Sequence, residues 1–325
     1  RTLCRFLPKS FIAALGRSAG ELSLFFFPRE KKICAGQLQY VFPHSAELVQ
    51  DNFTGLTRKV FGHIGESVAE LLIIDRMFEA EPGQLTPPSG AIPSQPPAFK
   101  HFTSSGEEII YGMLRNAKGA VALSGHIGCI ELLAAYHVRC GVPVLVIGRL
   151  PNYPVLARWL ERLRTHYGVE TLWRDEAGSA KKIIHALRDG KVIAALVDQD
   201  TALENCFAPF FGLDAASPVA LIRLAVRYRI PIFSTFIART ARLQHHIETQ
   251  NLDYEPDSPD VERQILTELN RRLERSILHH PAQWPWWHRR WRRRPGVDYQ
   301  ANPELLPSTN DYLSWLGKQQ RPKAV

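Results

Sequence analysis

Residues 120–133 read AVALSGHIGCIELL, an apolar run followed by a glycine-containing turn and the start of an amphipathic helix. The apolar run is typical of a buried strand, and Gly125 and Gly128 permit a tight turn after it. His126 lies where the strand ends, and Glu131 enters the helix that follows. Because ligand sites of open α/β sheets lie at the carboxyl ends of strands, this unit is a candidate active site.

The same alternation of short apolar runs and helical patterns continues on both sides of this unit. We expect further strands at residues 143–148, 169–173, 191–198, 231–238 and 243–249. Helices are expected at residues 46–80, 105–116, 130–140, 152–167, 177–189, 217–229 and 258–279. This order predicts an α/β fold in which a mixed, mostly parallel central sheet is flanked by helices.

The N-terminal segment predicts an amphipathic helix that begins at Pro8 and ends at Pro28. Three consecutive phenylalanines stand just before Pro28, and Arg29, Lys31 and Lys32 follow it. A helix with such cationic flanks is typical of one that lies in a membrane interface. The alternative is a helix that packs on the protein's own core. Its apolar residues recur at helical spacing at Phe11, Ile12, Leu15, Ala19, Leu22 and Phe26.

These patterns divide the chain into four regions. A helical membrane-docking region is expected at residues 1–82, followed by a Pro-rich loop at residues 83–100. An α/β catalytic domain at residues 101–300 and a C-terminal tail at residues 301–325 complete the chain. Proline removes backbone donors and fixes φ, so the Pro-rich stretch is a loop. It is either a solvated linker or a lid over the site.

Composition and charge narrow the function classes. The chain has 325 residues, of which 45% are hydrophobic, and this excludes a disordered chain. Five cysteines without a CxxC pair exclude a disulfide scaffold and a zinc ribbon. The formal net charge is +8, and five arginines without any acidic residue stand in residues 281–295. Residues 1–32 carry seven basic and two acidic residues. These two segments indicate contact with lipid headgroups, substrate phosphates or nucleic acid.

Patterns that hold nucleotides or metals are missing from the sequence. It contains no P-loop and no GxGxxG motif. The pairs His245–His246 and His279–His280 lack metal-ligand spacing and nearby acidic partners. GRSAG at residues 16–20 matches G-x-S-x-G, but a nucleophile elbow must follow a strand. We therefore expect no metal and no cofactor.

Four further segments carry motifs in a fixed order. These are residues 150–168 with Arg164 and Gly168, residues 187–200 with Asp198 and Gln199, PFFG at residues 209–212, and residues 269–295. The last segment has the pattern N-x-x-x-E-x-x-I…P-x-Q-x-x-W-x-H-R-R. Its matching residues are Asn270, Glu274, Ile277, Pro281, Gln283, Trp286, His288, Arg289 and Arg290.

Together with the HxxxxE motif of His126 and Glu131, these segments resemble the lipid A late acyltransferases. This is the lauroyl/myristoyl transferase family of the lysophospholipid-acyltransferase-like superfamily, and the resemblance covers nearly the whole chain. It implies an O-acyltransferase that moves a fatty acyl chain from an acyl-carrier-protein thioester to a hydroxyl of a lipid A precursor at the membrane. Between the two motif residues the chain has Ile-Gly-Cys-Ile where many relatives have Phe-Gly-Asn-Trp, which alters the expected pocket wall.

Acyl transfer gives each candidate residue a role. His126 is the expected general base, and Glu131 would hold it and stabilise its charge. The backbone N–H groups of Gly125 and Gly128 are candidate donors to the oxyanion. We expect the arginines of the site to converge on the anionic headgroup of the acceptor, because a guanidinium meets phosphate bidentately. The expected substrate-binding residues are Arg149, Arg164, Asp198, Arg289 and Arg290. A solvated helix face for Arg164 and a helix N-cap for Asp198 are the alternatives.

Residues 284–294 read WPWWHRRWRRR and hold four of the seven tryptophans. Tryptophan with arginine is typical of an interface with anionic lipid or a phosphorylated sugar. The alternatives are a core tryptophan cluster with a solvated basic tail, and a nucleic-acid-binding surface.

The expected partners are acyl carrier protein as donor, a glycolipid acceptor and a membrane surface, without nucleic acid or metal. Acyl coenzyme A is the alternative co-substrate. The expected location is the cytoplasmic face of a bacterial inner membrane, as a peripheral or monotopic protein. Because the chain begins with Arg1, we expect that part of the natural N-terminus, including a possible anchor, is missing. The alternative functions are acylation of another membrane lipid, such as a phosphatidylinositol mannoside or an aminolipid, and a non-catalytic basic membrane- or nucleic-acid-binding protein.

Overall fold

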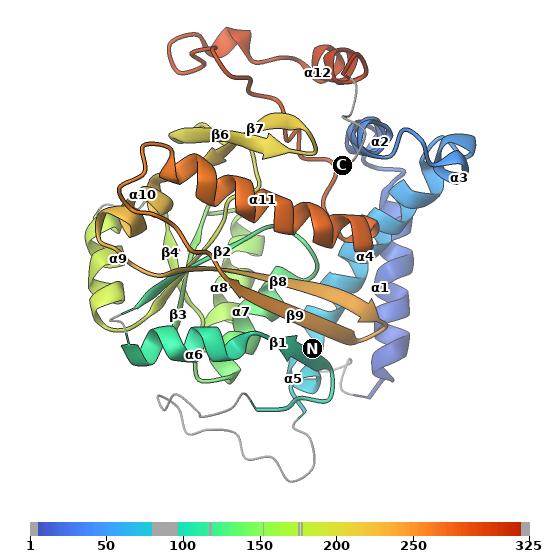
Figure 1. The fold of residues 1–325 in the computed structure, drawn as a ribbon. Helices are drawn as coiled ribbons and strands as arrows, with labels where there is room; N and C mark the ends of the chain where they lie inside the picture. The colour runs from blue at the N-terminus through green and yellow to red at the C-terminus, as the bar shows by residue number, and fades with distance from the viewer. Residues whose placement is uncertain are drawn as a thin grey trace.

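A central sheet carries helices on both faces, and the N-terminal helices gather at one end of the molecule (Figure 1). The computed structural model describes residues 6–79, 97–116, 119–151, 153–174, 176 and 178–319. Of the Pro-rich loop predicted at residues 83–100, all but the last four residues lie outside these ranges. The predicted α/β fold class is confirmed.

The central sheet has seven strands in the order β1-β9-β8-β2-β5-β3-β4. Every neighbouring pair is parallel except β8 and β9, so the expected mixed, mostly parallel sheet is confirmed. β1 is missing from the sequence prediction because its four residues, FTSS, form no apolar run. The strands are β1 Phe102–Ser105, β2 Ala120–Ser124, β3 Val144–Gly148, β4 Glu170–Trp173, β5 Val192–Leu196, β8 Ile232–Ala241 and β9 Gln244–Asn251.

The two faces of the sheet are covered by different helices. Successive side chains of β2 point to opposite faces. Val121 and Leu123 enter the core that also holds residues of α9, α10 and α11, whereas Ala120 and Ala122 pack with residues of α6. The flanking helices are α6 Glu107–Asn116, α7 Ile130–Arg139, α8 Pro154–His166, α9 Ser179–Arg188, α10 Ala220–Arg227 and α11 Val261–His279.

A second, two-stranded sheet is formed by β6 (Asn205–Phe210) and β7 (Leu213–Pro218). The PFFG motif supplies its turn, in which Phe211 and Gly212 both have positive φ, at 48° and 81°. Two positive φ values match the twist of a two-residue hairpin. This hairpin is absent from the sequence prediction, and it displaces the start of the helix expected at residue 217 to Ala220.

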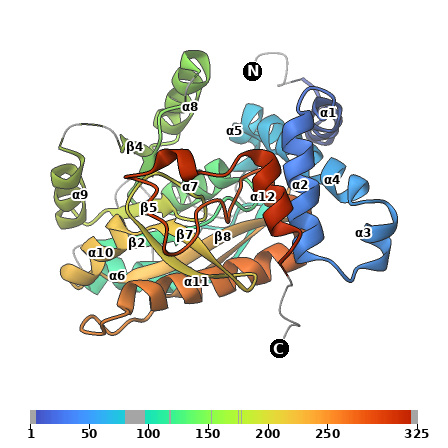
Figure 2. The same ribbon diagram turned by 90° about the horizontal axis from the view of Figure 1, so that it is seen from above.

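The remaining helices lie toward the two ends of the chain. They are α1 Lys9–Ser23, α2 Pro28–Val41, α3 Ala46–Gln50, α4 Thr54–Leu72, α5 Ile74–Met77, α12 Thr309–Leu316 and the 3-10 turns η2 Pro281–Gln283 and η3 Pro303–Leu305. Pro28 begins α2 instead of ending a helix, because proline needs no hydrogen-bond partner at the first helical position. α12 lies beside α2 (Figure 2), where Arg29 donates to Thr309 at 3.0 Å.

Helix α1 packs on α4 through glycines, and its outer face is exposed and apolar. A Cβ atom added at Gly65 would overlap the carbonyl oxygen of Gly16. Ile12 and Ala13 are buried on the inner side, so part of the apolar stripe packs on the protein's own core. The exposed large apolar residues of this region are Phe6, Leu7, Phe11, Leu15, Leu22, Phe25, Phe26 and Phe27. No helix within the described ranges is both long enough and apolar enough to cross a membrane.

We expect Gly65→Ala to destabilise the protein. The added methyl group has no space between α4 and α1, and overpacking of this kind costs about 1–3 kcal/mol. Gly112→Ala in α6 is the matched control, because its methyl group would meet nothing within 4 Å. The control should be neutral or stabilise by about 0.5–1 kcal/mol. Urea unfolding of both variants tests this, and equal stabilities would contradict the close helix packing.

Candidate active site

The turn after β2 holds His126 at the carboxyl edge of the sheet. Gly128 has a φ of 68°, and a Cβ atom there would overlap the carbonyl oxygen of Ile237 in β8. Gly125 is buried against Leu273, which leaves little room for a larger residue. The turn is therefore pressed against both the sheet and α11. The His126 side chain retains 25% of its exposure, so its ring can be reached from solvent.

Asp198 is the carboxylate that holds His126. It follows β5, the neighbour of β2 in the sheet. Its Oδ1 lies 2.6 Å from Nδ1 of His126, and its Oδ2 accepts the backbone N–H of His126 at 2.8 Å. The indole N–H of Trp284 also donates to Oδ2, at 2.8 Å. Burial alone would raise the pKa of Asp198, but the charge and hydrogen bonds of His126 and the bond from Trp284 lower it below its ordinary value.

Glu131 does not orient His126, which corrects the expected pairing. Its two carboxylate oxygens accept from Nε and Nη2 of Arg164, at 2.8 and 2.7 Å. Arg164, on α8, is buried and lies over the ring of Trp173. The reason is positional, because Glu131 in the first turn of α7 faces α8, whereas Asp198 leaves the strand beside His126. The two predicted carboxylates therefore have different partners.

Two residues join the site that were predicted only as motif matches. The side-chain nitrogen of Gln199 lies 3.0 Å from Nε2 of His126 and 2.8 Å from Nε2 of His288. Burial, and then the charge of His126, lower the pKa of His288 to about 4, so its ring is neutral near pH 7. Gln199 directly follows Asp198 at the end of a strand, a signal that the sequence contains. His288 comes from the distant closing segment and has no local signal.

The predicted oxyanion donors are partly occupied. The backbone N–H of Gly128 donates to the carbonyl oxygen of Gln283 at 3.1 Å. The backbone N–H of His126, between the two glycines, donates to Asp198. The expectation that Gly128 offers a free N–H group is therefore wrong in this structure. Gly125 keeps its predicted role as a candidate.

The predicted arginine cluster is contradicted at Arg290. This side chain is fully buried, with its guanidinium donating to the carbonyl oxygen of Ala216 and, at 2.7 Å, to the hydroxyl of Ser217. A buried guanidinium that binds the β6–β7 hairpin cannot contact a lipid headgroup. Arg289 is half-buried and donates to the carbonyl oxygen of Pro307 at 3.1 Å. Both arginines of the closing motif therefore hold parts of the chain together.

Arg149 and Arg164 differ in their surroundings. Arg149 is exposed directly after β3, at the carboxyl edge of the sheet, as expected. Arg164 is engaged by Glu131 and so is not a solvated helix residue. Among the four predicted substrate-binding arginines, only Arg149 is exposed. The other three are Arg164, Arg289 and Arg290.

The tryptophans of the closing segment form core instead of the expected interface. Trp284, Trp286 and Trp291 are each at most 1% exposed. Their indole N–H groups find partners inside the protein, such as the carbonyl oxygen of Phe210 for Trp291, at 3.1 Å. The alternative of a core tryptophan cluster is therefore correct. The basic residues of this segment also have partners, because Nη1 of Arg293 forms an ion pair with Oδ1 of Asp200 at 2.8 Å.

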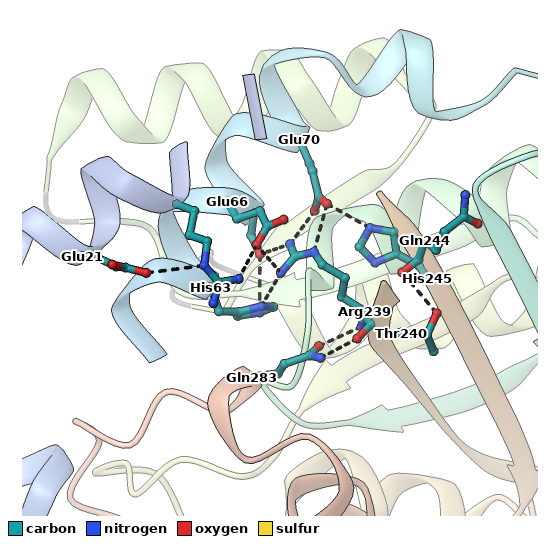
Figure 3. Close-up of polar contacts among 11 residues, drawn as sticks. Glu21, His63, Glu66, Glu70, Arg239, Thr240, Gln244, His245 and Gln283 are labelled. Carbon is teal, nitrogen blue, oxygen red and sulfur yellow. Dashed lines mark hydrogen bonds and ion pairs between the residues drawn. The ribbon is translucent and has the colours of Figure 1, made fainter. Parts of the chain in front are cut away.

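A buried charge network joins α4 to β8 and to Gln283 (Figure 3). The carbonyl oxygen of Gln283 accepts the N–H of Gly128, so the network reaches the catalytic turn. The guanidinium of Arg239, on β8, donates to both carboxylate oxygens of Glu70. The backbone N–H of Arg239 donates to the side-chain oxygen of Gln283 at 2.8 Å, and the side-chain nitrogen of Gln283 donates to the carbonyl oxygen of Arg239 at 2.7 Å. Burial would raise the pKa of Glu70, but His245 and Arg239 lower it to about 2. Burial, and then the charge of Arg239, lower the pKa of His63 to about 3. No group of three or more His, Cys, Asp or Glu side chains in the described part of the chain could hold a metal ion.

A largely apolar cavity lies between α7 and the sheet. Val142 and Val192 line it near the starts of β3 and β5, and Leu196 lines it at the end of β5. The cavity therefore runs along the strands to the carboxyl edge. Its walls are mostly apolar, and the polar residues that line it are Ser124, Glu131, His137, Arg164 and Thr235.

Comparison with known proteins assigns the chain to a family. Residues 1–293 match the family described as bacterial lipid A biosynthesis acyltransferase, and the chain belongs to it. It is similar to the lipid A biosynthesis palmitoleoyltransferase of Escherichia coli K12, with 23% identity over 89% of this chain and 87% of the relative. It is also similar to the lipid A biosynthesis lauroyltransferase of the same organism, with 25% identity over 89% and 88%. The chain is therefore an acyltransferase, as predicted.

We expect Asp198→Asn to abolish most activity while the protein stays folded. An amide would no longer select the His126 tautomer with its proton on Nδ1, and a base in the wrong tautomer loses about 10²–10⁴-fold in rate. The readout is kcat for acyl transfer, with thermal unfolding as the control for structure. A kcat near that of the wild type would contradict the orienting contact.

Glu131→Gln tests the role of Glu131 separately from that of Asp198. Alone it leaves a buried Arg164 unpaired, which costs about 3–5 kcal/mol of stability. The double variant Glu131→Gln/Arg164→Gln should regain part of that stability, because no charge stays uncompensated. Urea unfolding of the wild type, of Glu131→Gln, of Arg164→Gln and of the double variant measures the coupling. Additive losses would show that the ion pair is not the reason for either effect.

Proposed function

We propose that this acyltransferase moves a fatty acyl chain from an acyl-carrier-protein thioester to a hydroxyl of a lipid A precursor. The transfer takes place at the cytoplasmic face of a bacterial inner membrane. The observation that carries the proposal is the pair of His126 and Asp198 at the sheet edge, in a chain of the lipid A acyltransferase family. The glycolipid acceptor follows from that family. The carrier-protein donor rests on the resemblance of the motifs.

His126 is the proposed general base. Asp198 accepts a hydrogen bond from Nδ1–H, so Nε2 carries the lone pair that can receive the proton of the attacking hydroxyl. Asp198 is ionised and buried, which stabilises the imidazolium that forms. The acceptor oxygen attacks the thioester carbonyl carbon, the C–S bond breaks, and the imidazolium returns its proton to the leaving thiolate. No acyl-enzyme is needed, because both substrates meet at one base.

The apolar cavity beside α7 is the proposed site for the acyl chain. Glu131, which follows β2 at the carboxyl edge, lines it, so a chain inside it would have its thioester at the same sheet edge as His126. Small side chains at Ala134 of α7 and Ala194 of β5 keep its width. The names of the two relatives, lauroyl and palmitoleoyl transferase, indicate saturated and unsaturated chains of different length. Arg149, exposed at this edge, is the remaining candidate for contact with the acceptor phosphates.

The exposed aromatic face before α2 is the proposed membrane contact. Phe25 and Phe26 are 82% and 80% exposed, and Arg29, Lys31 and Lys32 follow on an exposed stretch. Apolar rings beside cations suit the boundary between acyl chains and anionic headgroups. Such a contact would hold the protein at the surface where a lipid acceptor is found.

We expect the purified protein to acylate a lipid A precursor when it is given an acyl-carrier-protein thioester. Mass spectrometry of products from a panel of donor chain lengths and acceptors provides the readout. Ala134→Leu should shift the preferred chain to a shorter one, because the larger side chain fills the cavity. Ala180→Leu on the exposed face of α9 is the control and should keep the wild-type preference. No acylated precursor from any donor would contradict the proposed function.

Membrane contact is tested with the double variant Phe25→Ser/Phe26→Ser. It should bind less to vesicles that contain anionic lipid, because two exposed rings are lost, each worth about 1.5–3 kcal/mol when buried. Tyr228→Ser/Leu278→Ser, which removes two exposed apolar side chains elsewhere, is the matched control. Binding of the wild type should also weaken as salt screens the basic residues. Equal sedimentation of both variants with vesicles would refute the proposed contact.

A further inference from the structure

Two backbone N–H groups of the catalytic turn are already occupied and cannot stabilise a tetrahedral intermediate. Attack on a thioester carbonyl creates an oxyanion, which hydrogen-bond donors must stabilise. In this structure the N–H of His126 is taken by Asp198, and the N–H of Gly128 is taken by Gln283. A donor from outside the turn, within reach of the base, would complete the site.

Gln199 places such a donor directly at the base. Its side-chain nitrogen lies 3.0 Å from Nε2 of His126, the atom that has to receive the proton. Nδ1 of His126 faces the Asp198 carboxylate and so carries a proton, which leaves Nε2 as an acceptor. The NH2 end of the Gln199 amide, and not its oxygen, therefore points to the ring.

His288 binds the same NH2 group of Gln199. Its Nε2 lies 2.8 Å from the same nitrogen of Gln199, and an NH2 group has two hydrogens to donate. The neutral ring of His288 is an acceptor at working pH. The hydrogen bond to His288 keeps Gln199 in place even when the bond to His126 is broken.

We propose that Gln199 is a catalytic residue that donates a hydrogen bond to the oxyanion, and that His288 positions it. This inference rests on the proposed acyl transfer. When the acceptor hydroxyl approaches Nε2 of His126, it takes the place of the Gln199 donor. The freed N–H then lies next to the carbonyl that the hydroxyl attacks.

The step is balanced as follows. The acceptor oxygen forms a bond to the thioester carbonyl carbon, and its proton moves to Nε2 of His126. The π electrons of the carbonyl move to its oxygen, which accepts the N–H of Gln199. When the oxyanion collapses, the C–S bond breaks, and the thiolate leaves with the electron pair and takes the proton from His126.

Gln199→Leu tests the inference, because it keeps much of the side-chain volume and removes both hydrogens. We expect kcat for acyl transfer to fall about 10²–10³-fold, the usual loss for one oxyanion donor, with KM nearly unchanged. The acid limb of the pH profile of kcat/KM should move to higher pH, because neutral Nε2 loses a donor in the free enzyme. Gln264→Leu, on the exposed face of α11, is the matched control and should change neither quantity.

A second measurement does not depend on turnover. Long-range proton–nitrogen NMR should show the Nε2 signal of His126, assigned by its loss in His126→Ala, at a changed shift in Gln199→Leu. His288→Leu should lower kcat less than Gln199→Leu does, because the donor is present but no longer held. If Gln199→Leu fails to fold, Gln199→Glu removes the same hydrogens at equal size and should lose at least as much activity.

The outcomes separate this inference from the function on which it rests. A wild type that acylates the precursor while Gln199→Leu keeps its kcat overturns the role of Gln199 alone. An unchanged His126 signal in Gln199→Leu overturns it as well, because the contact would then be absent. A wild type without transfer to any acceptor overturns the proposed function and this inference together.

Discussion

The contact between Asp198 and His126 is the interaction on which the site depends. The buried carboxylate of Asp198 accepts hydrogen bonds from the ring of His126, from the backbone N–H of His126 and from the indole N–H of Trp284. It therefore holds the base, the turn and the closing segment together. Removing a carboxylate from water is costly, and three donors together compensate that cost. The geometry requires β2 and β5 to be neighbours, so the strand order of the sheet is part of the chemistry.

The central part of the fold could be predicted from local patterns, and its edges could not. The strand β2 has the bounds that its apolar run predicts, because a strand buried on both faces is apolar throughout. β1 and the β6–β7 hairpin carry no such run, since their pairing with the rest of the chain decides their conformation. Pro28 shows the limit of single residues, because proline suits the start of a helix as well as its end.

The same limit applies to the site. The positions of His126, Glu131 and Asp198 at the sheet edge follow from strand ends, which the sequence reveals. Their partners do not follow from the sequence, because the arginine or histidine that binds each carboxylate lies far away along the chain. Composition was equally ambiguous at Trp284–Arg294, where tryptophan and arginine suit either a lipid interface or a core. The buried hydrogen bonds of Arg290 decide for the core, and only a three-dimensional structure supplies them.

The closing segment has a consequence for the order in which the enzyme becomes competent. Trp284 and His288, which complete the surroundings of Asp198 and Gln199, stand late in a chain that the ribosome makes from the N-terminus. The helices with the exposed aromatic face are synthesised before the strand that leads to His126. A nascent chain therefore presents its aromatic face well before it possesses a finished catalytic centre, and chemistry begins only after the closing segment has been made.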